Sequence, residues 1–191
     1  MARFPSLPDS ELNQAQSDLM ERIRRFSSAS ASGPFPMLLR SPILGDRFLS
    51  VSQYLRFETG LPEDLAELAI LIHARVREDA YEWSMHTGRA LAAGLSQDLI
   101  DDLWQGRKPR QMDARQAAVY RFCVQALRRQ SVDEVVFGEV KAALGESVVV
   151  DLTVTLGFYS MLSLMLAVAE ATAHGRELPP FPPMAEPLPW D

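Results

Sequence analysis

The sequence predicts an all-α protein with a single domain, and three observations lead to this prediction. Apolar residues recur every three or four positions through most of the 191-residue chain, which is the spacing of one helix face. Residues that cap helices precede several of these segments, and glycine or proline follows them. The segment richest in β-branched residues, 148–156, has no neighbouring segment that could pair with it as a strand, so we expect a helix there too.

The N-terminal part of the chain contains two of about seven to eight expected helices. The first spans about 12–26 behind a cap from Asp9 or Ser10, and the small-residue joint 27–33 ends it. The second spans about 42–60, with a proline in its first turn and a glycine at its end.

The other helices follow in close succession. Two of them begin at pairs with capping-box spacing, Asp113 with Gln116 and Ser131 with Glu134. In order, we expect helices at about 62–76, 79–93 and 96–106, from 113, at 131–145 and at 147–173.

We expect one domain over 1–191 because a chain of this length buries a core without disulfides or metals. Within it, 1–32 holds the first helix and joint, and 33–177 is the helical core. The tail, 178–191, has six prolines and should be extended over a surface or a neighbouring subunit.

Composition excludes several classes of protein. The net charge is −6, and the one basic cluster, 107–110, is split by a proline, so we expect no nucleic-acid partner. Residues 152–169 carry no charge, but their hydroxyl groups and the lack of flanking basic clusters favour a buried helix over a membrane span. The single cysteine, Cys123, fits a reducing compartment, and we expect a cytoplasmic protein.

Most catalytic signatures are missing from the sequence. It has no glycine-rich phosphate loop, no paired cysteines, no His-Glu-x-x-His and no nucleophile-elbow serine. Three histidines and one cysteine argue against a nitrogen- or sulfur-rich metal site, and we expect neither a metal nor a cofactor.

One helix face does collect residues capable of acid–base chemistry. Asp79, Glu82, His86 and Arg89 are three or four positions apart, with Trp83 beside them. A carboxylate one turn from an imidazole orients the ring and raises its pKa, which gives a proton donor near neutral pH.

Glu67 lies among apolar residues, where its carboxylate would be partly desolvated. The alternative interpretations are structural. A Glu and His at this spacing often form a surface or structural pair. Trp83 would then belong to the core. Glu67 would lie at the border of the buried helix face and extend its carboxylate to solvent.

Several stretches of the sequence resemble the carboxymuconolactone decarboxylase family. In its specific middle section they are Tyr54–Glu58, Leu61-Pro62, Glu67–Leu71, Tyr81-Glu82-Trp83 with His86, and Ala93–Ser96. Further agreement comes from Gly33–Phe35, Ser41-Pro42 and Gly157–Tyr159, so the resemblance covers about residues 33–165.

The resemblance implies an all-helical fold of the alkylhydroperoxidase D-like type that assembles as a trimer or hexamer. It also implies that Glu67, Glu82 and His86 share a pocket near a subunit boundary. In the branch of this fold that reduces peroxides, two cysteines stand where this sequence has Asp79 and Glu82. That chemistry is therefore absent, because a carboxylate cannot form the disulfide of the cycle.

The decarboxylase branch, which the Glu-Trp before the histidine resembles, acts without a cofactor on a carboxylated unsaturated lactone from aromatic-compound breakdown. For this chain the resemblance implies a lyase or isomerase. From the helix positions we expect His86 to transfer the proton, Glu82 to orient the ring and Glu67 to share or relay the proton. Residues expected to bind the substrate, a small organic acid, are Trp83, Arg56, Arg89 and Tyr159. The longer chain and the apolar run 164–167, where many relatives are polar, point to a divergent subgroup.

Two other functions compete with this one. The chain could be a non-catalytic family member that binds a small ligand or a partner. It could also be an alkylhydroperoxidase-like antioxidant protein, but that function would depend on Cys123, which we expect to be a buried structural residue.

Overall fold

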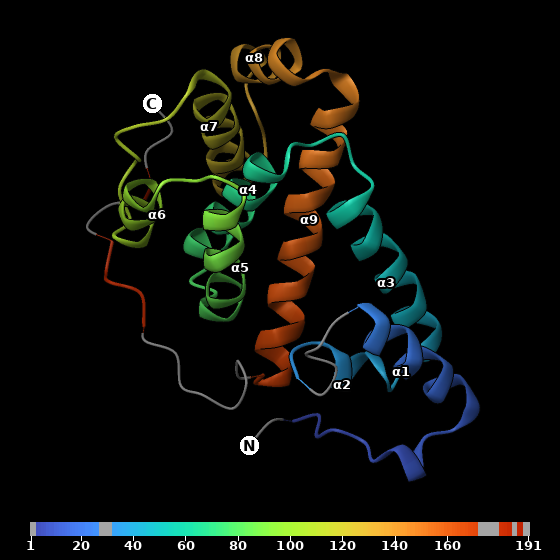
Figure 1. The fold of residues 1–191 in the computed structure, drawn as a ribbon. Coiled ribbons are helices and arrows are strands. Elements are labelled where there is room, and N and C mark those ends of the chain that lie inside the picture. The colour runs from blue at the N-terminus through green and yellow to red at the C-terminus, as the bar shows by residue number, and fades with distance from the viewer. Residues whose placement is uncertain (1–2, 27–31, 172–179, 185–186, 189–191) are drawn as a thin grey trace. The chain divides into compact units, whose positions relative to one another are not determined.

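The computed structural model is all-α, as the sequence predicts, and contains no strand among the residues it describes (Figure 1). It describes residues 3–26, 32–171, 180–184 and 187–188. A 3₁₀ turn at Asp9–Glu11 comes first. The helices are α1 (Gln14–Phe26), α2 (Phe35–Leu38), α3 (Pro42–Phe57), α4 (Glu63–Val76), α5 (Ala80–Ala92), α6 (Gln97–Trp104), α7 (Ala114–Arg129), α8 (Glu134–Leu144) and α9 (Glu146–Ala169).

The contacts between residues divide the chain into two compact units. The first comprises Met1–Thr59 with Met161–Leu178, and the second comprises Gly60–Ser160 with Pro179–Asp191. Helix α9 runs from the second unit into the first. The single-domain organisation stays a prediction. Residues 27–31 of the expected joint and 172–179, where the last helix was expected to end and the tail to begin, lie outside the described residues.

In the first unit, α1 packs beside α3 (Figure 1). Helix α1 is strongly amphipathic and buries Leu19, Met20 and Ile23. Gly45 on α3 permits this approach, because a β-carbon there would lie 2.5 Å from a methyl group of Leu19. A larger residue at this position would require the Leu19 side chain to move.

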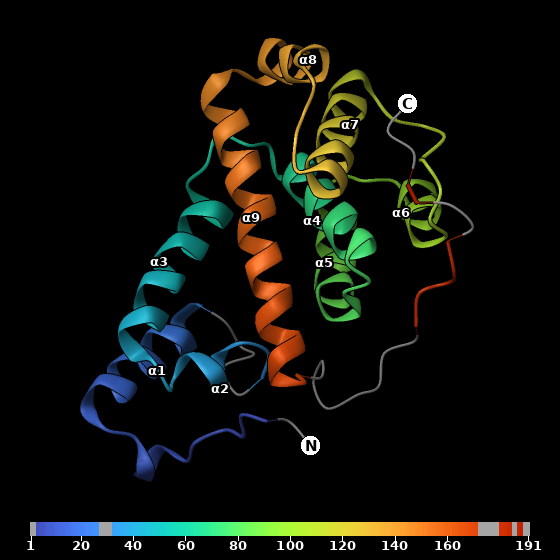
Figure 2. The same ribbon diagram turned by 180° about the vertical axis from the view of Figure 1, so that it is seen from behind.

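In the second unit, α4 is the central element, with α5, α6 and α7 packed against it (Figures 1 and 2). Ten of its fourteen residues are buried, which is why its sequence is apolar on more than one face. Three of the buried residues are polar: Glu67, His73 and Arg75. A buried polar side chain needs a hydrogen-bond partner, so the contacts of these three residues in the core are where a functional site is to be sought.

Local capping signals set most of the helix starts. The expected capping box of Asp113 and Gln116 opens α7, and Ser96 caps α6. The box expected at Ser131 is wrong, because the carboxylate of Asp133 accepts the hydrogen bond from the Val136 N–H and caps α8 instead. Asp133 is held in place by Gln125, whose amide donates to it at 2.7 Å.

Helix α9 confirms that the β-branched segment is helical rather than a strand. The hydroxyl groups of Thr153 and Thr155 each donate to a carbonyl four residues earlier, at 2.7 and 2.8 Å, which satisfies them inside the helix. By length and composition α9 is the one helix among the described residues that could cross a membrane. This is weak evidence, since 44% of the relevant window is buried in the protein and the core helix of a soluble protein passes the same test.

The described parts of the tail have no regular secondary structure and pack on the second unit, to which they belong. Two arginines hold them by donating to backbone carbonyls. Arg75 donates to Pro182 at 2.7 Å, and Arg128 donates to Leu188 at 2.6 Å. Leu188 is buried in the core of this unit.

Candidate functional site

A tight turn between α4 and α5 sets the position of the candidate acid–base residues. The N–H of Asp79 donates to the Ala74 carbonyl at 2.8 Å, and Glu78 has a positive φ of 53°. Asp79 then caps α5 by accepting a hydrogen bond from the Glu82 N–H at 3.0 Å. Asp79 therefore precedes α5 as its cap, where the sequence interpretation made it the first member of the helix face.

The two helices bring Glu67 and His86 into direct contact. Oε2 of Glu67 lies 2.6 Å from Nδ1 of His86. On the other side of the ring, Nε2 lies 3.2 Å from the hydroxyl of Tyr159 on α9 and 3.4 Å from Oε2 of Glu82. The Tyr159 ring stands nearly perpendicular to the imidazole, with the centroids 5.3 Å apart. We call Glu67, Glu82, His86 and Tyr159 the imidazole cluster.

The hydrogen-bond partners indicate where the protons lie. A carboxylate only accepts, so Nδ1 of His86 carries a hydrogen that it donates to Glu67. When the ring is neutral, the Tyr159 O–H donates to Nε2; when the ring is cationic, the Nε2–H faces Glu82 and the Tyr159 oxygen. The cluster thus accommodates both protonation states without moving the ring.

The pKa of His86 is raised. Burial by itself lowers the pKa of this imidazole, but hydrogen bonds and charge attraction from Glu67 and Glu82 outweigh that effect. His86 is therefore an imidazolium over a wider pH range than an exposed histidine, and it has a proton to give.

The imidazole cluster is nearly closed to solvent within this chain. The exposed fractions are 6% for Glu67, 3% for Glu82, 3% for His86 and 4% for Tyr159. In such an environment a hydrogen bond to a charged group is stronger than in water. That these residues share a pocket near a subunit boundary stays a prediction.

The predicted substrate-binding residues fall in different surroundings. Trp83 is buried on α5 against Trp104, with the ring centroids 5.4 Å apart, which is the core position of the alternative interpretation. Arg89 is half-buried on the same helix. Tyr159, as described, contacts His86 directly.

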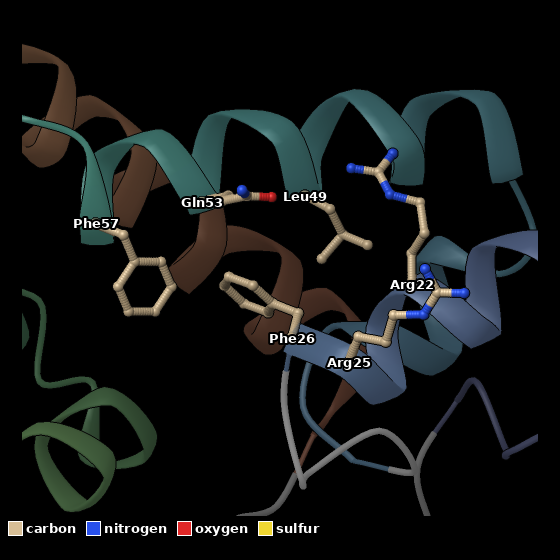
Figure 3. Close-up of a pocket in the computed structure, with 6 residues that line it drawn as sticks. All are labelled: Arg22, Arg25, Phe26, Leu49, Gln53 and Phe57. Carbon is tan, nitrogen blue, oxygen red and sulfur yellow. The ribbon is translucent and has the colours of Figure 1, made fainter.

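Arg56 belongs to the first unit, where it contacts two aromatic rings. Its guanidinium carbon lies 5.8 Å from the ring centroid of Phe26 and 5.2 Å from that of Phe57. Both rings line a cavity of about 380 Å³ between α1 and α3 (Figure 3). The two arginines that line it are already paired, Arg22 with Asp46 and Arg25 with Glu21.

A second buried histidine, His73 on α4, was not singled out from the sequence. Its Nε2–H faces the Ser160 oxygen at 3.2 Å, while the Ser160 hydroxyl donates to the Leu156 carbonyl at 2.8 Å. Burial, followed by the nearby charge of Arg77, lowers the pKa of His73 to about 4. No local signal in the sequence could reveal this, because Ser160 lies 87 positions away.

Ser160 and Arg77 also border a cavity of about 490 Å³ in the second unit. Its walls come mostly from apolar residues of α7, α8 and α9, among them Phe122, Phe137 and Val149. This volume lies in the range of small-ligand sites. No group of three His, Cys, Asp or Glu side chains in the described part of the chain is arranged to hold a metal ion.

Comparison with known proteins places this cluster in a family context. No curated protein sequence matches the chain. Residues 42–126 match the model of the carboxymuconolactone decarboxylase family. The matched segment contains Glu67, Glu82 and His86, whereas Tyr159 lies beyond it. The match confirms the resemblance to this family over residues 42–126.

Proposed function

We propose that this protein is a cofactor-independent lyase or isomerase that acts on a small carboxylated lactone or a related organic acid. The observation that carries the proposal is the buried imidazole of His86, held at one ring nitrogen by Glu67 and faced at the other by Glu82 and Tyr159. The match of residues 42–126 to the decarboxylase family model supports it.

In a decarboxylation, the bond between the substrate carbon and its carboxylate breaks, and carbon dioxide leaves. The electron pair remains on the carbon, where the conjugated lactone carbonyl accepts it as an enolate. A proton must then return to that carbon, and a positioned acid contributes about a hundred- to ten-thousandfold in rate. His86 supplies this proton in our proposal.

The geometry distinguishes the two ring nitrogens of His86. The Nδ1–H is bound tightly by Glu67 at 2.6 Å, whereas the contacts of Nε2 are longer, at 3.2 and 3.4 Å. The Nε2 proton is therefore the transferable one. Glu67 then orients the ring, a part that the sequence interpretation gave to Glu82, and Glu82 favours the cationic form.

We further propose that the active form is a trimer or hexamer in which a neighbouring subunit completes the substrate site. Apolar side chains stand exposed at intervals along α9, which supports an interface there. They are Val150, Val154, Met161, Leu164 and Val168. Light scattering should give a closed oligomer, and a monomer at micromolar concentration would contradict the shared site.

The cytoplasm is the compartment we propose. The one cysteine of the chain is free and fully buried, so the fold does not depend on an oxidising environment. Fluorescent tagging and cell fractionation would test this.

The central experiment compares two histidine variants. His86→Gln should lower turnover of candidate carboxylated lactones by about a hundred- to ten-thousandfold. His73→Gln, the matched control, removes another buried histidine of the same unit and should retain most of the turnover. Lactone absorbance and release of carbon dioxide are the readouts, with circular dichroism to confirm folding. Equal losses in both variants would contradict the proposal.

The cavity of about 490 Å³ favours a second candidate, a non-catalytic protein that binds a small apolar ligand. This function predicts saturable ligand binding that His86→Gln leaves unchanged, together with no turnover of any tested acid. A lactone whose turnover depends on His86 would exclude it as the sole function.

A further inference from the structure

Arg75 on α4 is a fully buried cation whose hydrogen-bonding capacity is only partly used. Its side chain has an exposed fraction of 0%, and Nη2 donates to the Pro182 carbonyl at 2.7 Å. Nε and Nη1 have no hydrogen-bond partner. Its charge partner, Glu78, is 3.8 Å from Nη1 and largely exposed. A buried guanidinium with two unpaired donors is costly, so this site favours a better acceptor than one neutral carbonyl.

The acceptor that Arg75 does have belongs to the tail. Segment 180–184 reads Pro-Phe-Pro-Pro-Met, and its three prolines have no N–H with which to bind the rest of the protein. The Pro182 carbonyl and the Phe181 ring make its described polar and aromatic contacts. The segment is thus held by the packing of Phe181 and Met184 and by one described hydrogen bond, and a ligand that offers a ring and a better acceptor can replace it.

The Phe181 ring fills a space between three side chains of the unit. Its centroid lies 4.6 Å from that of Trp104 and 5.4 Å from that of Trp83. The guanidinium carbon of Arg75 lies 4.8 Å from the same centroid. The Phe181 ring and the Pro182 oxygen that accepts a hydrogen bond from Arg75 are placed as the ring and carboxylate of a benzoate-like molecule would be.

Gly106 lies against Arg75 and Met184 beside this space. A β-carbon at Gly106 would lie 2.3 Å from Met184 and 3.0 Å from Nη2 of Arg75. With a φ of 70°, the residue adopts a conformation that glycine tolerates best. The backbone therefore approaches the guanidinium closely without a side chain between them.

We propose that Trp83, Trp104 and Arg75 form a binding site for a small aromatic carboxylate. In this structure the chain's own Phe181 ring and Pro182 carbonyl occupy it. The ligand would stack between the indoles and give Arg75 a charged, bidentate acceptor in place of a neutral carbonyl. The site does not depend on the proposed function, because none of its side chains belongs to the imidazole cluster.

Tryptophan fluorescence offers a direct test with benzoate as the probe. The chain has three tryptophans, and Trp190→Phe leaves only the two of the proposed site as reporters. In this background Phe181→Ala should bind benzoate saturably and about tenfold or more tightly than the parent, because the competing ring is gone. Equal affinity in the two proteins would overturn the proposed competition.

The charge requirement is tested with benzyl alcohol, which has the same ring without the carboxylate. It should bind Phe181→Ala about tenfold or more weakly than benzoate does. Arg75→Met should lose this preference, and an apolar replacement of a buried cation is usually tolerated by the fold. If that variant does not fold, the comparison of the two ligands still decides. Equal affinity for both ligands in Phe181→Ala would overturn the site.

His86→Gln separates this proposal from the proposed function. It should leave benzoate binding unchanged while it lowers turnover. Loss of benzoate binding in His86→Gln would contradict an independent site. Absence of turnover with normal benzoate binding would count against the proposed function alone.

Discussion

Two histidines of the second unit, His86 and His73, are buried to a similar degree, and their surroundings push them in opposite directions. The exposed fractions are 3% and 0%. Two carboxylates contact His86 and raise its pKa against the effect of burial. His73 faces a hydroxyl group and lies near Arg77, and its pKa falls to about 4. Burial thus sets no single protonation state; the neighbouring charges decide which histidine can carry a proton.

The largest effect should come from neutralising the two carboxylates that contact His86. Glu67→Gln should lower turnover by about a hundredfold, because the short contact to Nδ1 loses its charge and the pKa of His86 falls. Glu82→Gln should cost about tenfold, since its contact is longer. Steady-state kinetics with the same lactone measures both. A larger loss for Glu82→Gln would reverse the roles that we assign.

His73 should make the protein sensitive to acid. Its pKa in the folded state is about 4, below the ordinary 6.5, so the unfolded chain takes up this proton first as pH falls. The stability that a neutral His73 contributes is therefore present above pH 6.5 and is lost as pH falls to about 4, with a total on the order of 3 kcal/mol. His73→Phe should flatten this part of the profile of unfolding free energy against pH, measured with urea. An unchanged slope would contradict a neutral His73.

The stability that His86 contributes changes with pH in the opposite direction. Its folded-state pKa is raised, so its contribution to stability is present below 6.5 and is lost as pH rises through the folded-state value. His86→Gln should therefore remove a loss of stability on the alkaline side of 6.5, where His73→Phe has no effect. The two variants serve as controls for each other.

A smaller effect should come from the hydroxyl group of Tyr159. Tyr159→Phe keeps the ring against His86 and removes one neutral hydrogen bond, which is worth about 0.5–1.5 kcal/mol. Turnover should fall by up to about tenfold, and the pH profile should move while the fold is retained. A pH profile identical to the parent's would assign Tyr159 to packing alone.

The smallest effect should come from Cys123, a buried group that no charge activates. Its exposed fraction is 0%, and burial raises the pKa of its thiol, so the reactive thiolate is disfavoured. Cys123→Ala should leave lactone turnover unchanged, and peroxide consumption should stay at background in both proteins. Rapid peroxide consumption that disappears in Cys123→Ala would instead support the antioxidant alternative.

The sequence predicted what short-range physics determines. Helix starts at Ser96 and Asp113 follow from one side chain and an N–H three residues later, and the Glu82–His86 pair follows from helical spacing. The start at Ser131 was wrong because two capping residues, Ser131 and Asp133, compete within three positions and a contact from α7 selects the second.

Contacts between distant segments could not be predicted in this way. The Tyr159 hydroxyl meets His86 across 73 positions, and Arg75 meets Pro182 across 107. The sequence placed Tyr159 among the substrate-binding residues through the family resemblance, but its contact with the imidazole depends on how α9 packs. Nothing in the local sequence marks Arg75, near the end of its helix, as a fully buried cation.

The proton-transfer role of His86 depends above all on the pH at which its imidazole titrates. Nitrogen-15 NMR of the imidazoles distinguishes cationic from neutral rings, and His73→Gln, His86→Gln and His174→Gln would assign the three histidines of the chain. We expect His86 to titrate above the ordinary value of 6.5 and His73 to titrate well below it, at about 4. A neutral His86, titrating at or below the ordinary value of 6.5, would contradict the proton-transfer role of the imidazole cluster.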